Sequence, residues 1–193
     1  MTEMPHLIGG ALCLDFVNTV DPRHARERRE YLDSYPALVA WGSHAGAIDA
    51  EQGDRLREAL YSLFSQAGSR PRPERDDLGV LQAEVTGALA HFRVAWSPAG
   101  FGWEWDQASP GLDRVLWPVA WSAAELLVQG PLERIRECPG QDTCGWLFLD
   151  LSKNASRRWC DMRVCGNRAK ARRHYERTLS PANRSRSRAA SAV

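Results

Sequence analysis

Cys138-Pro-Gly-Gln-Asp-Thr-Cys144 and Cys160-Asp-Met-Arg-Val-Cys165 are two short cysteine pairs in the last third of this chain of 193 residues. Fifteen residues separate the two pairs. Zinc favours four thiolates in a tetrahedron, and two short turns joined by a hairpin can present them. With four sulfur ligands the metal has no open position for water. The pattern therefore predicts one structural zinc ion held by Cys138, Cys144, Cys160 and Cys165.

The four cysteines also allow two disulfide bonds, and a sequence alone does not fix their connectivity. The N-terminal residues Met1-Thr-Glu-Met-Pro-His6 lack the basic segment of a secretory signal. This favours a cytoplasmic protein, in which thiols stay reduced and clustered cysteines more often bind metal. Cys13 stands apart in an apolar segment, and we expect it to be a small buried side chain.

Charge is divided unevenly along the chain. Residues 151–193 carry 12 Lys or Arg and two acidic residues, a net charge of +10, whereas residues 1–150 carry 13 basic and 22 acidic residues, a net charge of −9. A positive field around the zinc site predicts binding to double-stranded DNA, with RNA as an alternative partner. The opposite charges could also draw the acidic part over the basic part and screen it. No apolar run approaches the roughly 18 residues of a membrane helix, so we expect no membrane partner.

The spacing of apolar residues predicts a mostly helical N-terminal domain with one hairpin. Residues 8–20 fit either a helix or a strand, and we favour a helix. Further helices are expected from Asp49 to near Gly68, from about Asp77 to Phe92, and from Ser109 to about Gln129, the last kinked at Pro118. Alternation around Ser97-Pro-Ala-Gly100 predicts a hairpin in which Val94 and Trp96 face Phe101, Trp103 and Trp105.

The C-terminal third suggests a different kind of domain. Trp146 and Phe148 favour a strand, residues 152–156 a turn, Arg157-Arg-Trp159 the returning strand, and the stretch from Cys165 a helix to Arg177. A zinc knuckle, a hairpin and a helix with ligands near its N-terminus describe a treble-clef finger. About 45 residues cannot build a sufficient core, so zinc would supply folding free energy on the order of 10 kcal/mol.

The fold class predicted from the sequence is therefore α+β, with a mostly helical N-terminal domain that carries a β-hairpin, followed by a small treble-clef zinc finger. We expect domains at residues 1–131 and 132–178. Residues 179–193 are rich in Ser, Arg and Ala, which is typical of a disordered basic tail.

Several motifs resemble a known family. Cys144-Gly-Trp-Leu-Phe-Leu-Asp150, Ser152-Lys-Asn154, Ser156-Arg-Arg-Trp-Cys160 and Cys165-Gly-Asn-Arg-Ala-Lys170 resemble the signature of CGNR zinc-finger proteins. Upstream, Leu12-Cys-Leu-Asp-Phe-Val-Asn-Thr-Val20 and Trp121-Ser-Ala-Ala-Glu-Leu-Leu127 resemble the ABATE domain that precedes this finger. The first knuckle is one residue longer than is common in relatives. The resemblance implies a bacterial, stress-related transcription regulator with an α+β N-terminal domain and a treble-clef C-terminal domain.

Arginine and lysine near the zinc site are candidate nucleic-acid contacts, because guanidinium groups bind phosphate and guanine edges in bidentate fashion. The candidates are Lys153, Arg157, Arg158, Arg168, Lys170, Arg172 and Arg173. Alternatively, Arg157 or Arg158 pairs with Asp150 across the hairpin.

In the N-terminal domain, Asp15 and Asn18 would share a helix face. They could line a small-molecule effector pocket or, as we favour, bond to local backbone. A cluster of Trp96, Trp103 and Trp105 could wall a ligand cleft. No catalytic constellation is recognisable, so we expect no enzyme. The predicted function is a DNA-binding transcription regulator with a sensor or association module; an RNA-binding protein or a protein-interaction adaptor is the alternative. The sequence leaves the oligomeric state open.

Overall fold

The structure, a computed structural model, describes residues 5–34, 37, 40–41, 51–69, 75–106, 114, 116–140 and 143–179. The N-terminal part contains four of the labelled helices and two hairpins: α1 (Leu12–Val17), β1 (Val20–Asp21), β2 (Arg29–Glu30), α3 (Glu51–Gln66), α4 (Arg75–Leu89), β3 (Phe92–Ser97), β4 (Gly100–Trp105) and α5 (Leu116–Gln129). The C-terminal part contains β5 (Ile135–Glu137), β6 (Leu147–Leu149) and α6 (Asn167–Leu179). The predicted α+β class is confirmed. Asp49, Ser109 and the tail from Ser180 lie outside the described residues.

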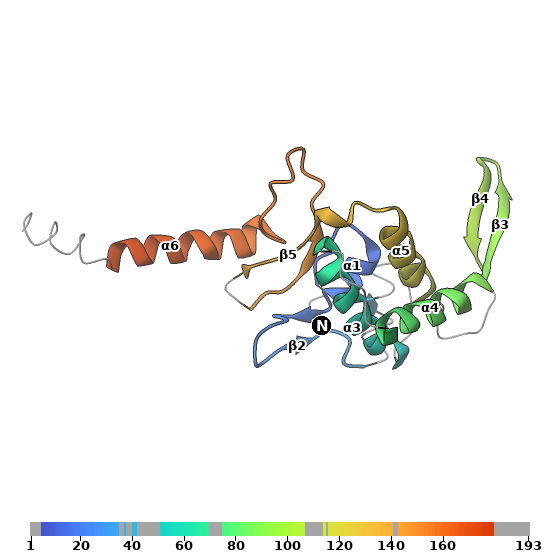
Figure 1. Cartoon of the computed structure of the whole chain (residues 1–193), viewed down its shortest axis with the longest axis horizontal. Coiled ribbons are helices and arrows are strands. Elements are labelled where there is room, and N and C mark those ends of the chain that lie inside the picture. Colours follow the sequence, from blue (N-terminus) through green and yellow to red (C-terminus); the bar gives the residue numbers. More distant parts are fainter. Residues whose placement is uncertain are drawn as a thin grey trace, which may run out of the picture.

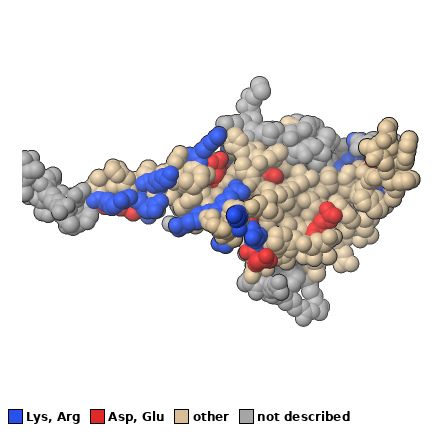
Figure 2. Space-filling model, turned by 90° about the horizontal axis from the view of Figure 1, so that it is seen from above, with Lys and Arg blue, Asp and Glu red and all other residues tan. Residues whose placement is uncertain are grey.

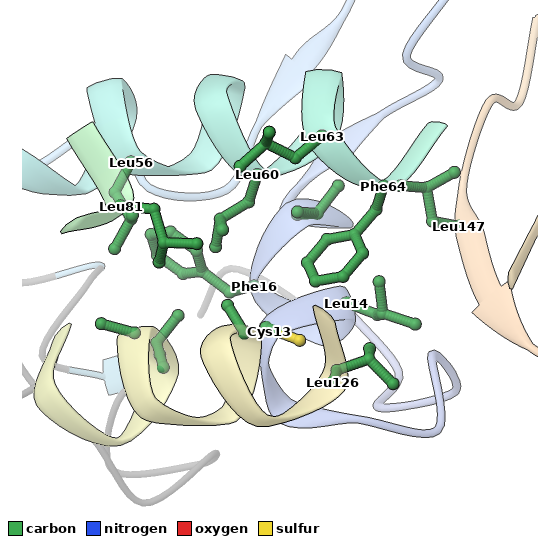
Figure 3. Close-up of a cluster of buried hydrophobic side chains, with 14 of the residues drawn as sticks. Cys13, Leu14, Phe16, Leu56, Leu60, Leu63, Phe64, Leu81, Leu126 and Leu147 are labelled. Atoms are coloured by element: carbon green, nitrogen blue, oxygen red, sulfur yellow. The ribbon is translucent and has the colours of Figure 1, made fainter. Parts of the chain in front are cut away.

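The core forms around the short helix α1, which lies between α3 and α5 (Figure 3). Four of its apolar side chains are buried, Cys13, Leu14, Phe16 and Val17, and Leu12 is partly buried. A helix of six residues is unstable alone, because nucleation costs more than so few hydrogen bonds return. Tertiary burial of this apolar face therefore decides that the segment is a helix. Burial also raises the pKa of Cys13 to about 12, so its thiol stays protonated.

The β5–β6 hairpin shares this core although it belongs to the C-terminal part. Ile135, Leu147 and Leu149 are buried in the same apolar cluster as α1, α3 and α5. The strands pair antiparallel, with Ile135 opposite Leu149, and the N–H of Leu149 also donates to the carbonyl oxygen of Gly9 at 2.7 Å. The two parts of the chain therefore share one apolar core, and the four cysteines form a second buried cluster with Trp146 and Phe148.

The strand partner of β6 differs from the prediction. β6 pairs with β5 across the first cysteine pair, not with Arg157-Arg-Trp159, which forms no strand. The turn at residues 152–156 does form, with the N–H of Ala155 donating to the carbonyl oxygen of Ser152 at 3.1 Å. After that turn the N–H of Arg157 donates to the Asp150 carboxylate at 3.0 Å, and this local bond replaces a strand ladder.

Two helix boundaries also differ from the prediction. Phe92 does not continue α4; it begins β3, where it lies opposite Trp105 and packs on Trp103 with ring centroids 4.7 Å apart. Cross-strand aromatic contacts of this kind outweigh the helical spacing of the apolar residues that lead up to Phe92. Pro118 lies in the first turn of α5, where its missing N–H has no intrahelical acceptor, so the described helix needs no kink there.

Two elements project from the body. The β3–β4 hairpin and helix α6 extend from opposite ends of the long axis of the molecule (Figure 1). The hairpin has the predicted register, with Val94 opposite Trp103 and Trp96 opposite Phe101. Because α6 points away from the body, the described residues of the acidic N-terminal part do not cover the projecting length of this helix.

Candidate metal centre and basic surface

The first cysteine pair closes the loop of the β5–β6 hairpin. The N–H of Cys138 donates to the carbonyl oxygen of Trp146 at 2.8 Å, and the N–H of Cys144 donates to that of Gly140 at 3.1 Å. A side chain at Gly140 has no room, because its Cβ would lie 2.8 Å from the Cys165 sulfur and 2.9 Å from Cβ of Cys144. The glycine thus lets the loop approach the second pair closely.

The second pair lies at the turn that leads into α6, with Cys160 before the turn and Cys165 within it. Asp161 follows Cys160 and caps a five-residue π-helical turn, Met162–Gly166, by accepting a hydrogen bond from the N–H of Arg163 at 2.5 Å. Cys165 lies within this wider turn, directly before α6. Such local widening is often found at functional positions. Here it fixes α6 to the sulfur cluster.

The four sulfur atoms match a tetrahedral zinc site. Sγ of Cys144 lies 3.6 Å from that of Cys160, which lies 3.7 Å from that of Cys165, and all four lie within 4.8 Å of one another. Zinc–sulfur bonds of about 2.3 Å require sulfur separations of roughly 3.8 Å. The four side chains are 3–7% exposed and form no disulfide. Hydrogen bonding to the Cys138 sulfur raises the pKa of Cys144 and Cys160, since so many close sulfurs cannot all be ionised without a cation.

Arg157 packs beside the sulfur cluster and hydrogen-bonds to the backbone around it. Its guanidinium lies 4.4 Å from the ring centroid of Phe148 and donates to the carbonyl oxygens of Trp159 at 3.1 Å, Ile8 at 3.0 Å and Cys160. These bonds join the segment before α1 to the second cysteine pair. The predicted nucleic-acid contact at Arg157 is thus a side chain whose donors face the protein interior.

Asp150 organises the loop that carries Lys153. The side chain is buried, and one carboxylate oxygen accepts from both the N–H and the hydroxyl of Ser152, at 2.9 and 2.6 Å. The other oxygen accepts from the N–H of Arg157, and the guanidinium of Arg136 lies 3.9 Å away. The Ser152 hydroxyl holds the pKa of Asp150 below its usual value. The alternative in which Arg157 or Arg158 pairs with Asp150 is thus met only by the backbone N–H of Arg157. The bonds of Asp150 hold Lys153 on an exposed turn.

The other predicted basic contacts are exposed. Figure 2 shows blue side chains gathered along α6 and on the body beside its start. The predicted contacts that are exposed are Lys153, Arg158, Arg168, Lys170, Arg172 and Arg173. Arg163 and Arg177 are exposed too and were not named, although the charge of the C-terminal segment already included them.

The basic residues of α6 fall on two faces. Lys170, Arg173 and Arg177 are spaced at i, i+3 and i+7, which aligns them along one stripe of the helix. Within the described residues no carboxylate pairs with any of the three. On the other face Arg172 forms an ion pair with Glu176 at 2.9 Å.

Asp15 and Asn18 are both engaged with backbone. Asp15 accepts from the N–H of Gly9 at 2.7 Å, and burial raises the pKa of its carboxyl group. Asn18 is fully buried; its amide nitrogen donates to the carbonyl oxygen of Leu147 at 2.9 Å, and its amide oxygen accepts from the N–H of Leu147 at 2.9 Å. Asn18 thus pairs α1 with β6 as a strand neighbour would.

Two buried arginines of the N-terminal part were not anticipated from the sequence. Arg57 donates to both carboxylate oxygens of Glu30, at 2.8 and 2.7 Å. Arg23 donates to Glu58 at 2.9 Å and lies 4.0 Å from the ring centroid of Tyr61; burial lowers its pKa. No local motif marks these residues, because Glu30 lies 27 residues from Arg57 and Glu58 lies 35 residues from Arg23.

A cavity of about 360 Å³ lies beside the sulfur cluster, where the two parts of the chain meet. Asp21 and Tyr31 line it from the N-terminal part, and Asp161 and Arg168 line it from the C-terminal part. Burial raises the pKa of Asp21, and the nearby charge of Arg168 counteracts this. Asp15 and Asn18 are not among the residues that line this cavity.

These features define a protein with a helical N-terminal domain and a structural zinc finger. Residues 10–130 match the ABATE family, described as "Putative stress-induced transcription regulator", and residues 134–178 match the CGNR zinc finger. The chain belongs to the ABATE family and carries one zinc site formed by Cys138, Cys144, Cys160 and Cys165. Both matches are to regulatory and zinc-finger types rather than enzymes. No curated protein matches the chain. In the described part of the chain, no helix is both long and apolar enough to cross a membrane.

Proposed function

We propose that this chain is a cytoplasmic, non-enzymatic transcription regulator that binds duplex DNA through α6 and the loop around Lys153. The observation that supports this most strongly is the basic stripe of Lys170, Arg173 and Arg177, with which no described carboxylate pairs, on a helix that projects from the body (Figure 1). A helix of 13 residues is roughly 20 Å long and fits the major groove.

Zinc serves this function by fixing the direction of α6. Cys165 is a zinc ligand and lies two residues before α6 begins at Asn167. The metal would therefore hold the start of the helix against the body. Charged side chains on a fixed helix lose less entropy on binding than those on a free tail. The zinc ion itself, with four sulfur ligands, binds no substrate.

The experiment that tests this proposal compares the binding of the zinc-loaded chain to duplex DNA and to structured RNA by fluorescence anisotropy. If about five basic side chains contact phosphates, the logarithm of the binding constant falls with the logarithm of salt concentration with a slope of roughly −4 to −5. Arg173→Ala should weaken binding and reduce that slope by about one. Arg55→Ala, an exposed arginine on α3, is the matched control and should leave both unchanged.

Other outcomes would change the assignment. Tighter binding to RNA than to duplex DNA would favour the RNA-binding alternative. Binding that does not respond to salt would favour the protein-interaction adaptor. Binding that Arg55→Ala weakens as much as Arg173→Ala would refute α6 as the DNA-contacting surface. The sensor role of the N-terminal domain stays a prediction; a molecule bound in the cavity beside Arg168 would touch both matched regions.

A further inference from the structure

The β3–β4 hairpin carries large apolar side chains that remain exposed and that no other described residue covers. Trp96 is 70% exposed, Phe101 82% and Trp103 67%, and Val94 is exposed beside them. The pairing register puts all four on one face of the hairpin, because residues directly opposite in a ladder share a face. We call these four residues the aromatic face.

The aromatic face continues an ordered stack that begins in the core. Trp117 is buried on α5, and the ring of Trp105 lies 6.2 Å from it between centroids. Phe92 packs on Trp105 at 4.3 Å, and Trp103 stacks on Phe92 at 4.7 Å. These ring contacts pack the base of the hairpin on α5. The exposed rings lie further along the same two strands, towards the tip.

The opposite face of the hairpin is polar and small. Arg93 and Glu104 lie opposite each other there, 3.6 Å apart, followed by Ala95 opposite Gly102. The hairpin is therefore amphipathic, yet within the described residues its apolar side packs on nothing beyond its base. A two-stranded hairpin is marginally stable in water by itself, and an exposed apolar patch of this size is typical of an interaction site.

We propose that the aromatic face is a homodimer interface, in which two copies of this chain pack their hairpins face to face. An isologous dimer buries the same patch on both copies, so a single apolar face suffices on each. Aromatic side chains carry about 150–250 Å² each, which at the observed exposures gives roughly 300–550 Å² from the three rings. Two copies would bury roughly 600–1,100 Å² from the rings, and Val94 and the strand backbones add to this. The total reaches the roughly 1,000 Å² of a specific interface.

The size and shape of this face favour a second copy over other occupants. Interfaces near the lower size limit are typical of weak, reversible complexes, so we expect a dissociation constant on the order of 1–50 µM. The face carries no charge that would select an acidic or basic partner: Arg93 and Glu104 lie on the other side and pair with each other. The interface is also remote from α6, at the opposite end of the molecule (Figure 1), so association and DNA binding can be measured separately.

The test is sedimentation velocity of the zinc-loaded full chain without DNA, from about 1 to 100 µM, a range that brackets the expected dissociation constant. The double variant Trp96→Thr/Phe101→Thr removes the two most exposed rings and keeps β-forming residues. The dissociation constant of this variant dimer should be at least ~100-fold higher than that of the native dimer. Val128→Thr is the matched control, since Val128 is an equally exposed apolar residue on α5, outside the hairpin, and this variant should dimerise normally.

Each outcome decides the proposal. A native chain that stays monomeric at about 100 µM overturns it and leaves the face to a different partner. A double variant that dimerises as the native chain does overturns the hairpin as the interface, and so does a Val128→Thr variant that becomes monomeric. Zinc content, melting temperature at low concentration and DNA anisotropy of the double variant should match those of the native monomer, which excludes misfolding. Failure of DNA binding alone would not affect the dimer proposal.

Discussion

Asn18→Ala is the substitution that best tests whether the two parts of the chain fold as one unit. The amide of Asn18 makes both of its hydrogen bonds to the backbone of Leu147, each 2.9 Å long, at a site with no solvent exposure. Alanine would leave the N–H and the carbonyl oxygen of Leu147 buried and unpaired. Each such group costs about 1–3 kcal/mol, so the free energy of unfolding should fall by about 2–6 kcal/mol.

The assay is denaturant unfolding of the zinc-loaded chain, followed both by helical circular dichroism and by zinc release. At a loss of about 4 kcal/mol the melting temperature should fall by roughly 8–16 °C for a domain of this size. Asn18→Asp should be no less destabilising, because it keeps one acceptor, loses the donor and buries a charge. The matched control is Asn154→Ala, which removes an amide from an exposed turn.

A loss below about 1 kcal/mol for Asn18→Ala would refute this reasoning, because it would mean that the two Leu147 groups find other partners. Two separate unfolding transitions, with zinc released in only one of them, would also contradict a shared core. In that case the finger would fold independently of α1, as the sequence alone suggests.

Further predictions concern the metal, the basic helix and one buried carboxyl group. Purified chain should contain one zinc, and Cys160→Ser should release it and lower the melting temperature of the N-terminal helices as well, measured by elemental analysis and circular dichroism; unchanged helix melting would contradict this. Glu176→Gln should strengthen duplex DNA binding, because it frees Arg172 and removes an acid from α6, and anisotropy showing weaker binding would argue against α6 as the contact. Asp15→Asn should gain stability relative to the native chain as pH rises. Burial raises the pKa of Asp15 above the unfolded value of 3.8, so the native chain loses stability from that value upward through the folded pKa, and the variant does not. Denaturation at a series of pH values measures the difference, which should not be constant.

How far the sequence could predict this molecule depended on the sequence separation of the interacting residues. The cysteine pairs, the alternation around Ser97 and Gly100, and the charge of α6 are local patterns, and the elements they predicted are present. The pairing of β6 with β5 and the bond from the Arg157 N–H to Asp150 both depend on how the loops between these residues fold. The sequence therefore led to the wrong strand partner for β6. Asn18 and Leu147 are 129 residues apart, and no spacing rule links an amide at the end of α1 to a strand beyond the first knuckle.

The site shows the same division. The four zinc ligands followed from type and spacing alone, because zinc restricts both. Arg157 could not be separated from its neighbours in sequence, yet its guanidinium faces carbonyl oxygens while Arg158 next to it is exposed. Orientation of this kind follows from the Asp150 bond to the Arg157 backbone, which only tertiary structure reveals.

The Asn18–Leu147 pairing has a consequence for synthesis of the chain on the ribosome. Bacterial and eukaryotic ribosomes add roughly 5–20 residues per second, so about 6–26 s pass between the synthesis of Asn18 and that of Leu147. Throughout this interval the buried face of α1 can pack on α3 and α5 as they emerge, but its edge towards β6 stays open. The last ligand, Cys165, arrives later still. The N-terminal core is therefore completed at about the time that zinc binds. In the absence of zinc, a nascent chain would expose both the edge of α1 that faces β6 and the four cysteines.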